Sequence, residues 1–238
     1  MVHYGDAGPP TKERRREERV AQILAAALQV VEEHGVEGVT IARMAKILMW
    51  SVGALYRYFP GKEAVLAELQ IQVLGDLGEA IVERIDAALQ APEVSMLPPG
   101  DRSLLALLVA ADCYRRHAED EPARFALLSG VLAAPREVLK GQEAEAVGMA
   151  MSGLLDRVTR LVESATDAGS LQPGSAPERT LLLWSSVQGL LQMRKIALLD
   201  PRLPDLPTLV LQLTEGLLLG WGAEAASLVF VRPFATMP

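Results

Sequence analysis

Helical periodicity runs along almost the whole of this 238-residue chain and constrains its fold more than any other feature. Apolar residues recur every three or four positions, whereas alternation with polar residues extends over no long stretch. Because this period places apolar side chains on one face of a helix, the pattern predicts an all-α fold. The helices are predicted over residues 13–33, 41–48, 51–58, 62–89, 101–118, 122–132, 136–168, 176–199 and 206–226.

Capping residues set the ends of the first predicted helices. Gly35 is suited to end the helix over 13–33, because glycine readily adopts the left-handed backbone found at helix C-termini. Thr40 and Ser51 each precede a short helix, where a hydroxyl can accept a hydrogen bond from an unpaired backbone N–H. Pro60 ends the second short helix.

Prolines and glycines mark the connections further along the chain. Residues 91–100 and 169–177 are expected to form loops, and a proline-rich turn precedes the helix over 206–226. The segment 176–199 is apolar nearly all round. We therefore expect it to be buried, partly between two subunits.

Bulk composition favours a globular cytoplasmic protein. Half of the residues are hydrophobic, no apolar run reaches the roughly 20 residues that span a bilayer, and residues 1–10 lack an apolar signal segment. The single cysteine, Cys113, excludes an internal disulfide, and three scattered histidines make a structural metal site an unfavoured interpretation.

The charge is distributed unevenly, although the net charge of −7 looks wrong for a DNA-binding protein. Residues 1–62 contain nine Lys/Arg and seven Asp/Glu, a balance of +2, whereas residues 63–238 carry −9. The basic excess lies in an N-terminal arm that contains Lys12, Arg14, Arg15, Arg16 and Arg19. An acidic body behind a basic head would direct the head towards DNA, but a solvated tail is the alternative.

The segment 40–62, TIARMAKILMWSVGALYRYFPGK, predicts a helix-turn-helix. Two helices of about two turns each would be joined by a short turn and held by a small core. That core is expected to contain Met44, Ala45, Trp50, Leu55 and Phe59. The free face of the second helix would carry Ser51, Val52, Ala54, Tyr56 and Arg57, which can enter a major groove.

Three pieces of this region resemble the TetR/AcrR family of regulators: ILAAAL (23–28), HGVEGVTIARMA (34–45) and SVGALYRYFPGKEAVL (51–66). The last piece is the most specific. The resemblance implies that Thr40 and Arg43 meet phosphates and that the tip of the recognition helix lies at Ser51, Val52, Gly53 and Ala54. It also implies that Tyr56 and Tyr58 contact the DNA backbone and that Lys62 lies against a phosphate. All of these residues, together with Arg57, are the predicted DNA-binding residues.

The chain departs from the family pattern at four positions. Met49 stands where most members have glycine, and Trp50 where they have a small aliphatic residue. Val52 replaces a common lysine, and Ala54 a threonine or serine. We therefore expect a wider turn, base reading through apolar contact with thymine methyl groups, and affinity that depends on the basic arm.

Residues 63–238 are expected to form a helical ligand-binding and dimerisation domain behind the DNA-binding domain of residues 1–62. Few polar side chains converge there, which suits a small hydrophobic ligand. Candidate lining residues are Tyr114, His117, Phe125, Met149, Trp184, Gln188 and Met193; the alternative for each is ordinary core or surface. Two subunits would pair through residues 177–199 and 206–226.

No catalytic group is evident in the sequence. Ser103, Ser129 and Ser152 lack a nucleophile-elbow motif, and the histidines are not spaced as metal ligands. There is no glycine-rich phosphate loop. We therefore predict neither enzymatic activity, nor a cofactor, nor a metal.

The sequence thus predicts a homodimeric DNA-binding regulator, a repressor that a small hydrophobic ligand releases from its operator. Two alternatives remain. One is a DNA-binding regulator controlled by a partner protein. The other is an all-helical binding module or enzyme that keeps a vestigial DNA-binding head.

Overall fold

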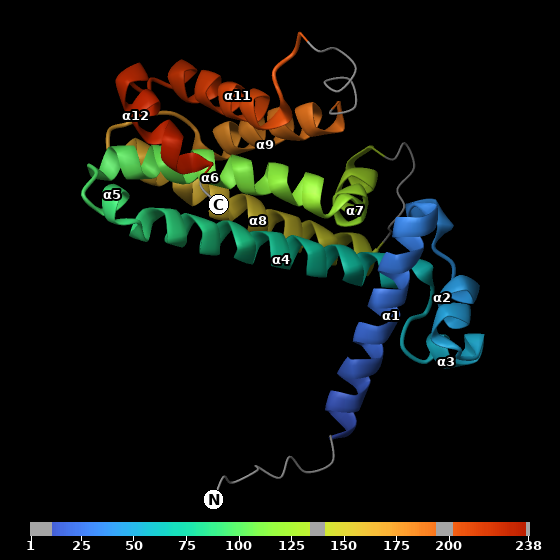
Figure 1. Ribbon diagram of the computed structural model, residues 1–238. Coiled ribbons are helices and arrows are strands. Elements are labelled where there is room, and N and C mark those ends of the chain that lie inside the picture. The colour runs from blue at the N-terminus through green and yellow to red at the C-terminus, as the bar shows by residue number, and fades with distance from the viewer. Residues whose placement is uncertain (1–10, 134–140, 194–201, 237–238) are drawn as a thin grey trace, which may run out of the picture. The chain divides into compact units, whose positions relative to one another are not determined.

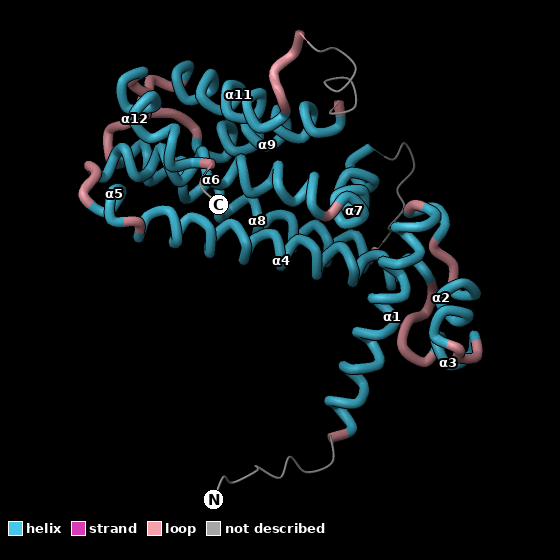
Figure 2. Tube along the Cα trace, in the orientation of Figure 1, coloured by secondary structure: helices cyan, strands magenta, loops and turns pink. Residues whose placement is uncertain are grey.

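The computed structural model describes residues 11–133, 141–193 and 202–236. Every regular element within these ranges is a helix, which confirms the predicted all-α fold (Figure 1, Figure 2). Within them, no helix has the length and apolar character needed to cross a membrane. The chain divides into two compact units. Unit 1 takes the described part of residues 1–70 and 126–147, and unit 2 the described part of 71–125 and 148–238.

Unit 1 contains three helices that precede the long helix α4 (Lys62–Gln90), whose first residues also belong to it. They are α1 (Lys12–His34), α2 (Ile41–Leu48) and α3 (Val52–Tyr56), with the 3-10 turn η1 (Val36–Gly38) between the first two. α2 packs against α1, and α3 packs against α2 (Figure 1). The core of the unit contains buried apolar side chains, including Ile23, Ala27, Val30, Met44, Leu55 and Leu66.

Hydroxyl caps begin the short helices as predicted. Thr40 Oγ1 accepts a hydrogen bond from the backbone N–H of Arg43 at 3.2 Å, and Ser51 Oγ accepts one from Ala54 at 3.2 Å. Each bond satisfies an N–H group that has no partner within the first helical turn. Gly35, with φ 71°, ends α1.

The turn between α2 and α3 contains a residue in the left-handed region. Met49 has φ 54° and ψ 36°, which for a residue with a Cβ atom costs roughly 1–2 kcal/mol. The following N–H, that of Trp50, donates to the carbonyl oxygen of Ala45 at 2.9 Å. These features close the turn tightly enough for α3 to begin three residues after Met49.

Unit 2 is built around α6 (Pro99–Asp120), which is buried over most of its length. Three later helices pack against α6: α9 (Ala176–Gln192), α11 (Leu206–Gly220) and α12 (Ala225–Ala235). α11 also packs against α9. The other elements that contribute to the unit are the remainder of α4, α5 (Pro92–Ser95), the start of α7 (Pro122–Ala133) and most of α8 (Gln142–Asp167).

Two of the elements predicted from the sequence were wrong. The expected loop over 91–100 contains α5, because Pro92 at a first helical position opens a single turn. The predicted last helix, 206–226, is two helices separated near Gly222, and α12 was not predicted. Gly222 has φ 100°, and an added Cβ would lie 2.5 Å from Cγ of Gln172. Segments 134–140 and 194–201, which overlap predicted helices, lie outside the described residues.

Candidate nucleic-acid interface

A small buried core holds α3 in unit 1. Met44, Ala45, Leu55 and Phe59 are buried, as predicted, and Trp50 is half-buried. Because α3 has only five residues, it would not be stable as an isolated helix. Its position therefore depends on Leu55, the one residue of α3 that is fully buried.

The opposite side of α3 is exposed. Val52 is 43% exposed and Tyr56 54%, and Ala54 is half-buried. Ser51, Gly53 and Arg57 are also exposed. A Cβ added to Gly53 would meet no atom within 4 Å, so packing within the chain does not require glycine there. The face that the sequence predicts for DNA contact is thus open to a partner.

The remaining predicted DNA contacts flank this face. Thr40 and Arg43 are exposed, whereas Tyr58 and Lys62 are half-buried. Arg43 is held in place, because its Nη1 donates to the carbonyl oxygen of Gly38 at 2.7 Å. This bond fixes the guanidinium beside the start of α2 before any ligand arrives.

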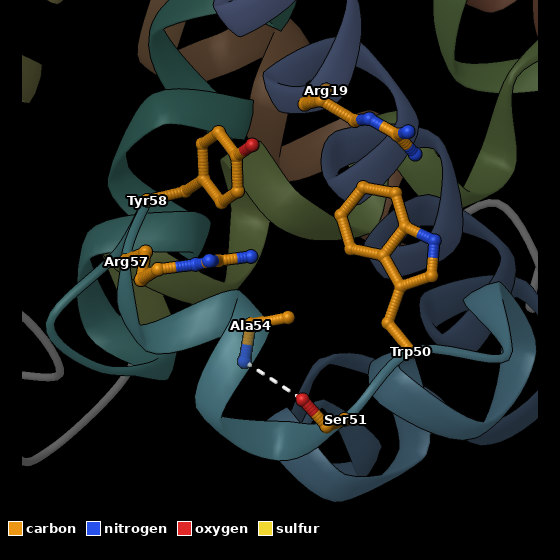
Figure 3. A pocket seen from close by; sticks show the side chains of 6 residues that line it. All are labelled: Arg19, Trp50, Ser51, Ala54, Arg57 and Tyr58. Atoms are coloured by element: carbon orange, nitrogen blue, oxygen red, sulfur yellow. Dashed lines mark hydrogen bonds between the residues drawn. The ribbon is translucent and has the colours of Figure 1, made fainter.

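A cleft of about 360 Å³ lies beside α3 and is lined by Arg19, Trp50, Ser51, Ala54, Arg57 and Tyr58 (Figure 3). The guanidinium carbon of Arg19 lies 4.6 Å from the centroid of the Trp50 ring, a cation–π contact. The ring centroids of Trp50 and Tyr58 are 6.3 Å apart. Sequence reasoning missed the Arg19–Trp50 contact, because nothing in the spacing of these two residues indicates that they meet.

In unit 2, four of the predicted ligand-binding residues lie together. The Tyr114 hydroxyl donates to Oε1 of Gln188, and its ring centroid lies 5.9 Å from that of Phe125. Trp184 also forms a hydrogen bond with the Tyr114 side chain. Burial raises the pKa of Tyr114 far above its usual value, although the Trp184 hydrogen bond acts in the opposite direction. The phenol is therefore a neutral hydrogen-bonding group.

The other three candidates differ in their surroundings. His117 is one turn after Tyr114 on α6, and within the described part of the chain its buried Nε2 has no hydrogen-bond partner. Burial lowers the pKa of His117, against an opposing effect of Glu121. Met149 and Met193 are 70% and 57% exposed, so the structure does not bring them into this cluster.

The buried charges of unit 2 are paired. Asp112 accepts hydrogen bonds from Arg115 at 2.7 Å and Arg116 at 2.8 Å. The described residues contain no group of three or more His, Cys, Asp or Glu that could hold a metal ion. Burial raises the pKa of Cys113, which favours the protonated thiol. Asp112 is thus neutralised within the unit by the two arginines that it contacts.

The short exposed helix α3, packed through α2 onto α1, defines a helix-turn-helix protein. Residues 23–69 match the family model for bacterial regulatory proteins of the tetR family. The HTH-type transcriptional regulator BetI 1 of Chromohalobacter salexigens is 35% identical over 74 residues, which cover 31% of this chain and 37% of that protein. The matched segments span less than half the length of such curated relatives.

Solved structures extend the likeness to most of the fold. A protein of unknown function from Rhodococcus sp. RHA1 superposes with a TM-score of 0.69 at 19% identity, covering 93% of this chain and 100% of that one. FadR from Bacillus subtilis, in complex with stearoyl-CoA, gives 0.62 at 17% identity, covering 84% and 98%. Residues 23–69 thus resemble the tetR family of bacterial regulatory proteins, and most of the chain shares its fold with these solved structures.

Proposed function

We propose that this chain is a transcriptional regulator that binds a double-stranded DNA operator through the exposed face of α3. One observation carries the proposal: Val52 and Tyr56 are exposed on a helix whose one fully buried residue is Leu55, and Arg57 is exposed at the C-terminal cap of that helix. A face of this kind can enter a major groove, which is about 12 Å wide. The proposed contacts are Thr40, Arg43, Ser51, Val52, Gly53, Ala54, Tyr56, Arg57, Tyr58 and Lys62.

These contacts would divide between sequence reading and phosphate binding. Val52 is the exposed apolar residue nearest the start of α3 and would meet thymine methyl groups. Arg43, Arg57 and Lys62 would bind phosphates, which adds affinity that weakens as salt increases. Such a regulator would act on DNA in the cytoplasm.

Two copies of the chain would pair through α9 and α11. These helices pack against each other and leave Leu181, Leu182 and Leu219 exposed, at 55%, 52% and 46%. A symmetric pair could place two recognition helices about one DNA turn apart, roughly 34 Å, on a near-palindromic operator. Analytical ultracentrifugation tests this pairing: a Leu182→Glu protein should sediment as a monomer where the unchanged protein is a dimer.

A small hydrophobic ligand in unit 2 would release the repressor from DNA. The cluster of Tyr114, Phe125, Trp184 and Gln188 supports this mode, since it sets a few hydrogen-bonding groups within an apolar interior. FadR from Bacillus subtilis, of similar fold, was solved with stearoyl-CoA. Continuous α4, which contributes to both units, would carry the change between them.

Fluorescence anisotropy with a labelled duplex from the region upstream of the gene tests DNA binding. The unchanged chain should bind at 50 mM salt, and Arg57→Ala should weaken binding and reduce the salt dependence by about 0.9 per lost phosphate contact. Arg160→Ala, which removes an exposed arginine of α8 in unit 2, is the matched control and should leave binding unchanged. Absence of binding by the unchanged chain to every duplex at low salt would contradict the proposal.

Ligand release is tested separately by thermal unfolding and anisotropy with stearoyl-CoA as the first probe. A ligand at 100 times its dissociation constant adds about 2.7 kcal/mol of stability. It should also lower affinity for the duplex by about 5- to 150-fold. If stearoyl-CoA stabilises the protein but does not lower its affinity for the duplex, the proposed release by a small ligand is wrong. The alternative is then a regulator controlled by a partner protein.

A further inference from the structure

The cleft beside α3 combines residues from three parts of unit 1. Arg19 comes from α1, Trp50 and Ser51 from the turn, and Arg57 from the C-terminal cap of α3 (Figure 3). The predicted DNA contacts include Ser51 and Arg57, but they include neither Arg19 nor Trp50. The cleft thus extends the exposed face of α3 onto a second helix.

The lining of the cleft is cationic. Arg19 and Arg57 contribute two guanidinium groups, and none of the six lining residues is acidic. Arg19 Nη1 donates to Oε1 of Gln22 at 3.2 Å, and this acceptor is neutral and does not cancel the guanidinium charge. Two like charges at one cleft favour a bound anion, because an anion lowers the electrostatic energy of both.

Aromatic side chains fix the shape of this cleft. The Trp50 ring lies 4.6 Å from the guanidinium carbon of Arg19 and 6.3 Å, between centroids, from Tyr58. The backbone N–H of Trp50 donates to the carbonyl oxygen of Ala45 at 2.9 Å, and this hydrogen bond fixes the backbone from which the ring extends. In Figure 3 the Arg57 side chain reaches towards the middle of the cleft from the side opposite Trp50.

We propose that this cleft binds a phosphodiester group of the operator backbone between the guanidinium groups of Arg19 and Arg57. Ser51 Oγ accepts a hydrogen bond from the Ala54 N–H at 3.2 Å, and its own hydroxyl proton can be donated to a phosphate oxygen. Trp50 is a positioning residue that holds Arg19 at the rim. The proposal rests on the proposed DNA binding and adds a phosphate site formed jointly by α1 and the turn.

Paired charge-removing variants on α1 test the role of Arg19. Arg19→Gln should lower affinity for the upstream duplex about five- to tenfold and reduce the slope of log affinity against log salt by about 0.9. Arg14→Gln removes the same charge from an arginine that pairs with Glu18 at 3.2 Å, and it should have the smaller effect. Equal affinities and slopes for the two variants would overturn the proposal.

A double-mutant cycle tests the role of Trp50. Trp50→Leu should weaken duplex binding in the unchanged chain but have little further effect once Arg19→Gln is present. Trp50→Phe, which keeps an aromatic face, should bind almost as well as the unchanged chain and shows whether loss of binding comes from misfolding. An equal effect of Trp50→Leu in both backgrounds would overturn the positioning role.

Two further comparisons distinguish failure of the proposed DNA binding from failure of the cleft assignment. If the unchanged chain binds no duplex at 50 mM salt, the proposed function fails; if it binds and Arg19→Gln equals Arg14→Gln, only the cleft assignment fails. Replacing chloride with inorganic phosphate at equal ionic strength should weaken duplex binding more in the unchanged chain than in Arg19→Gln, because free phosphate competes with the DNA backbone for the cleft. An equal effect on the two proteins would overturn the assignment of the cleft to a DNA phosphate.

Discussion

Tyr114 of α6 donates a buried hydrogen bond to the side-chain carbonyl of Gln188 on α9, and so joins two helices within unit 2. Both residues are only 6% exposed, so neither polar group can turn to bulk water. Each therefore satisfies the other in an otherwise apolar region. The same bond orients the phenol within the proposed ligand-binding cluster.

Removing the Tyr114 hydroxyl should destabilise the protein. Tyr114→Phe keeps the ring against Phe125 but leaves Oε1 of Gln188 without this donor, at a cost of about 1–3 kcal/mol. Urea denaturation measures the loss. Tyr56→Phe removes a hydroxyl from an exposed ring and should change stability by less than about 0.5 kcal/mol; equal losses would contradict the assigned role.

His117 should make stability depend on pH. Because burial lowers its pKa below the ordinary 6.5, the unfolded chain takes up a proton before the folded chain does. Stability should therefore fall as pH falls through and below 6.5. Urea denaturation at pH 7.5 and 5.5 should show a smaller difference in stability for His117→Gln than for the unchanged chain, and an equal difference in the two proteins would contradict this role of His117.

Leu55 is predicted to be the residue on which α3 depends. Leu55→Ala should remove about 2–5 kcal/mol of packing energy from unit 1 and abolish duplex binding. Hydrogen exchange of the amides of residues 40–60 should show lost protection there. Val52→Ala, on the exposed side of the same helix, should keep that protection while weakening discrimination at thymine positions.

Met49 is predicted to be a site where substitution stabilises the protein. Met49→Gly should relieve the strain of the left-handed backbone, whereas the greater conformational freedom of glycine in the unfolded chain opposes this effect. We expect a net increase of up to about 1 kcal/mol in the free energy of unfolding. Met96→Gly is the control, since Met96 is also highly exposed but has φ −89°. A lower melting temperature for Met49→Gly would show that the Met49 side chain has a role in the turn.

The features that sequence alone predicted best are local ones. The caps at Thr40 and Ser51 act on N–H groups only three residues away, so their geometry is fully encoded in short segments. The core around Leu55 and Phe59 follows from helical spacing. The same helical spacing places the remaining residues of α3 on the exposed face.

The features that sequence missed depend on residues far apart in the chain. The break at Gly222 is stabilised by Gln172, whose N–H donates to the carbonyl oxygen of Trp221 at 2.9 Å. The Arg19–Trp50 contact likewise needs the packing of α1 to be known. Met149 is apolar, but the residue type alone does not tell whether the side chain faces the core or the surface. In the structure it is exposed.

Site-specific photocross-linking tests most directly whether α3 enters DNA. A benzophenone amino acid would replace Val52 in one full-length protein and Met96, which is 88% exposed in unit 2, in another. We predict that the Val52-substituted protein cross-links to bases of the upstream duplex on irradiation and that the Met96-substituted protein does not. Duplex binding without any cross-link from position 52, or equal cross-linking from both positions, would contradict the account.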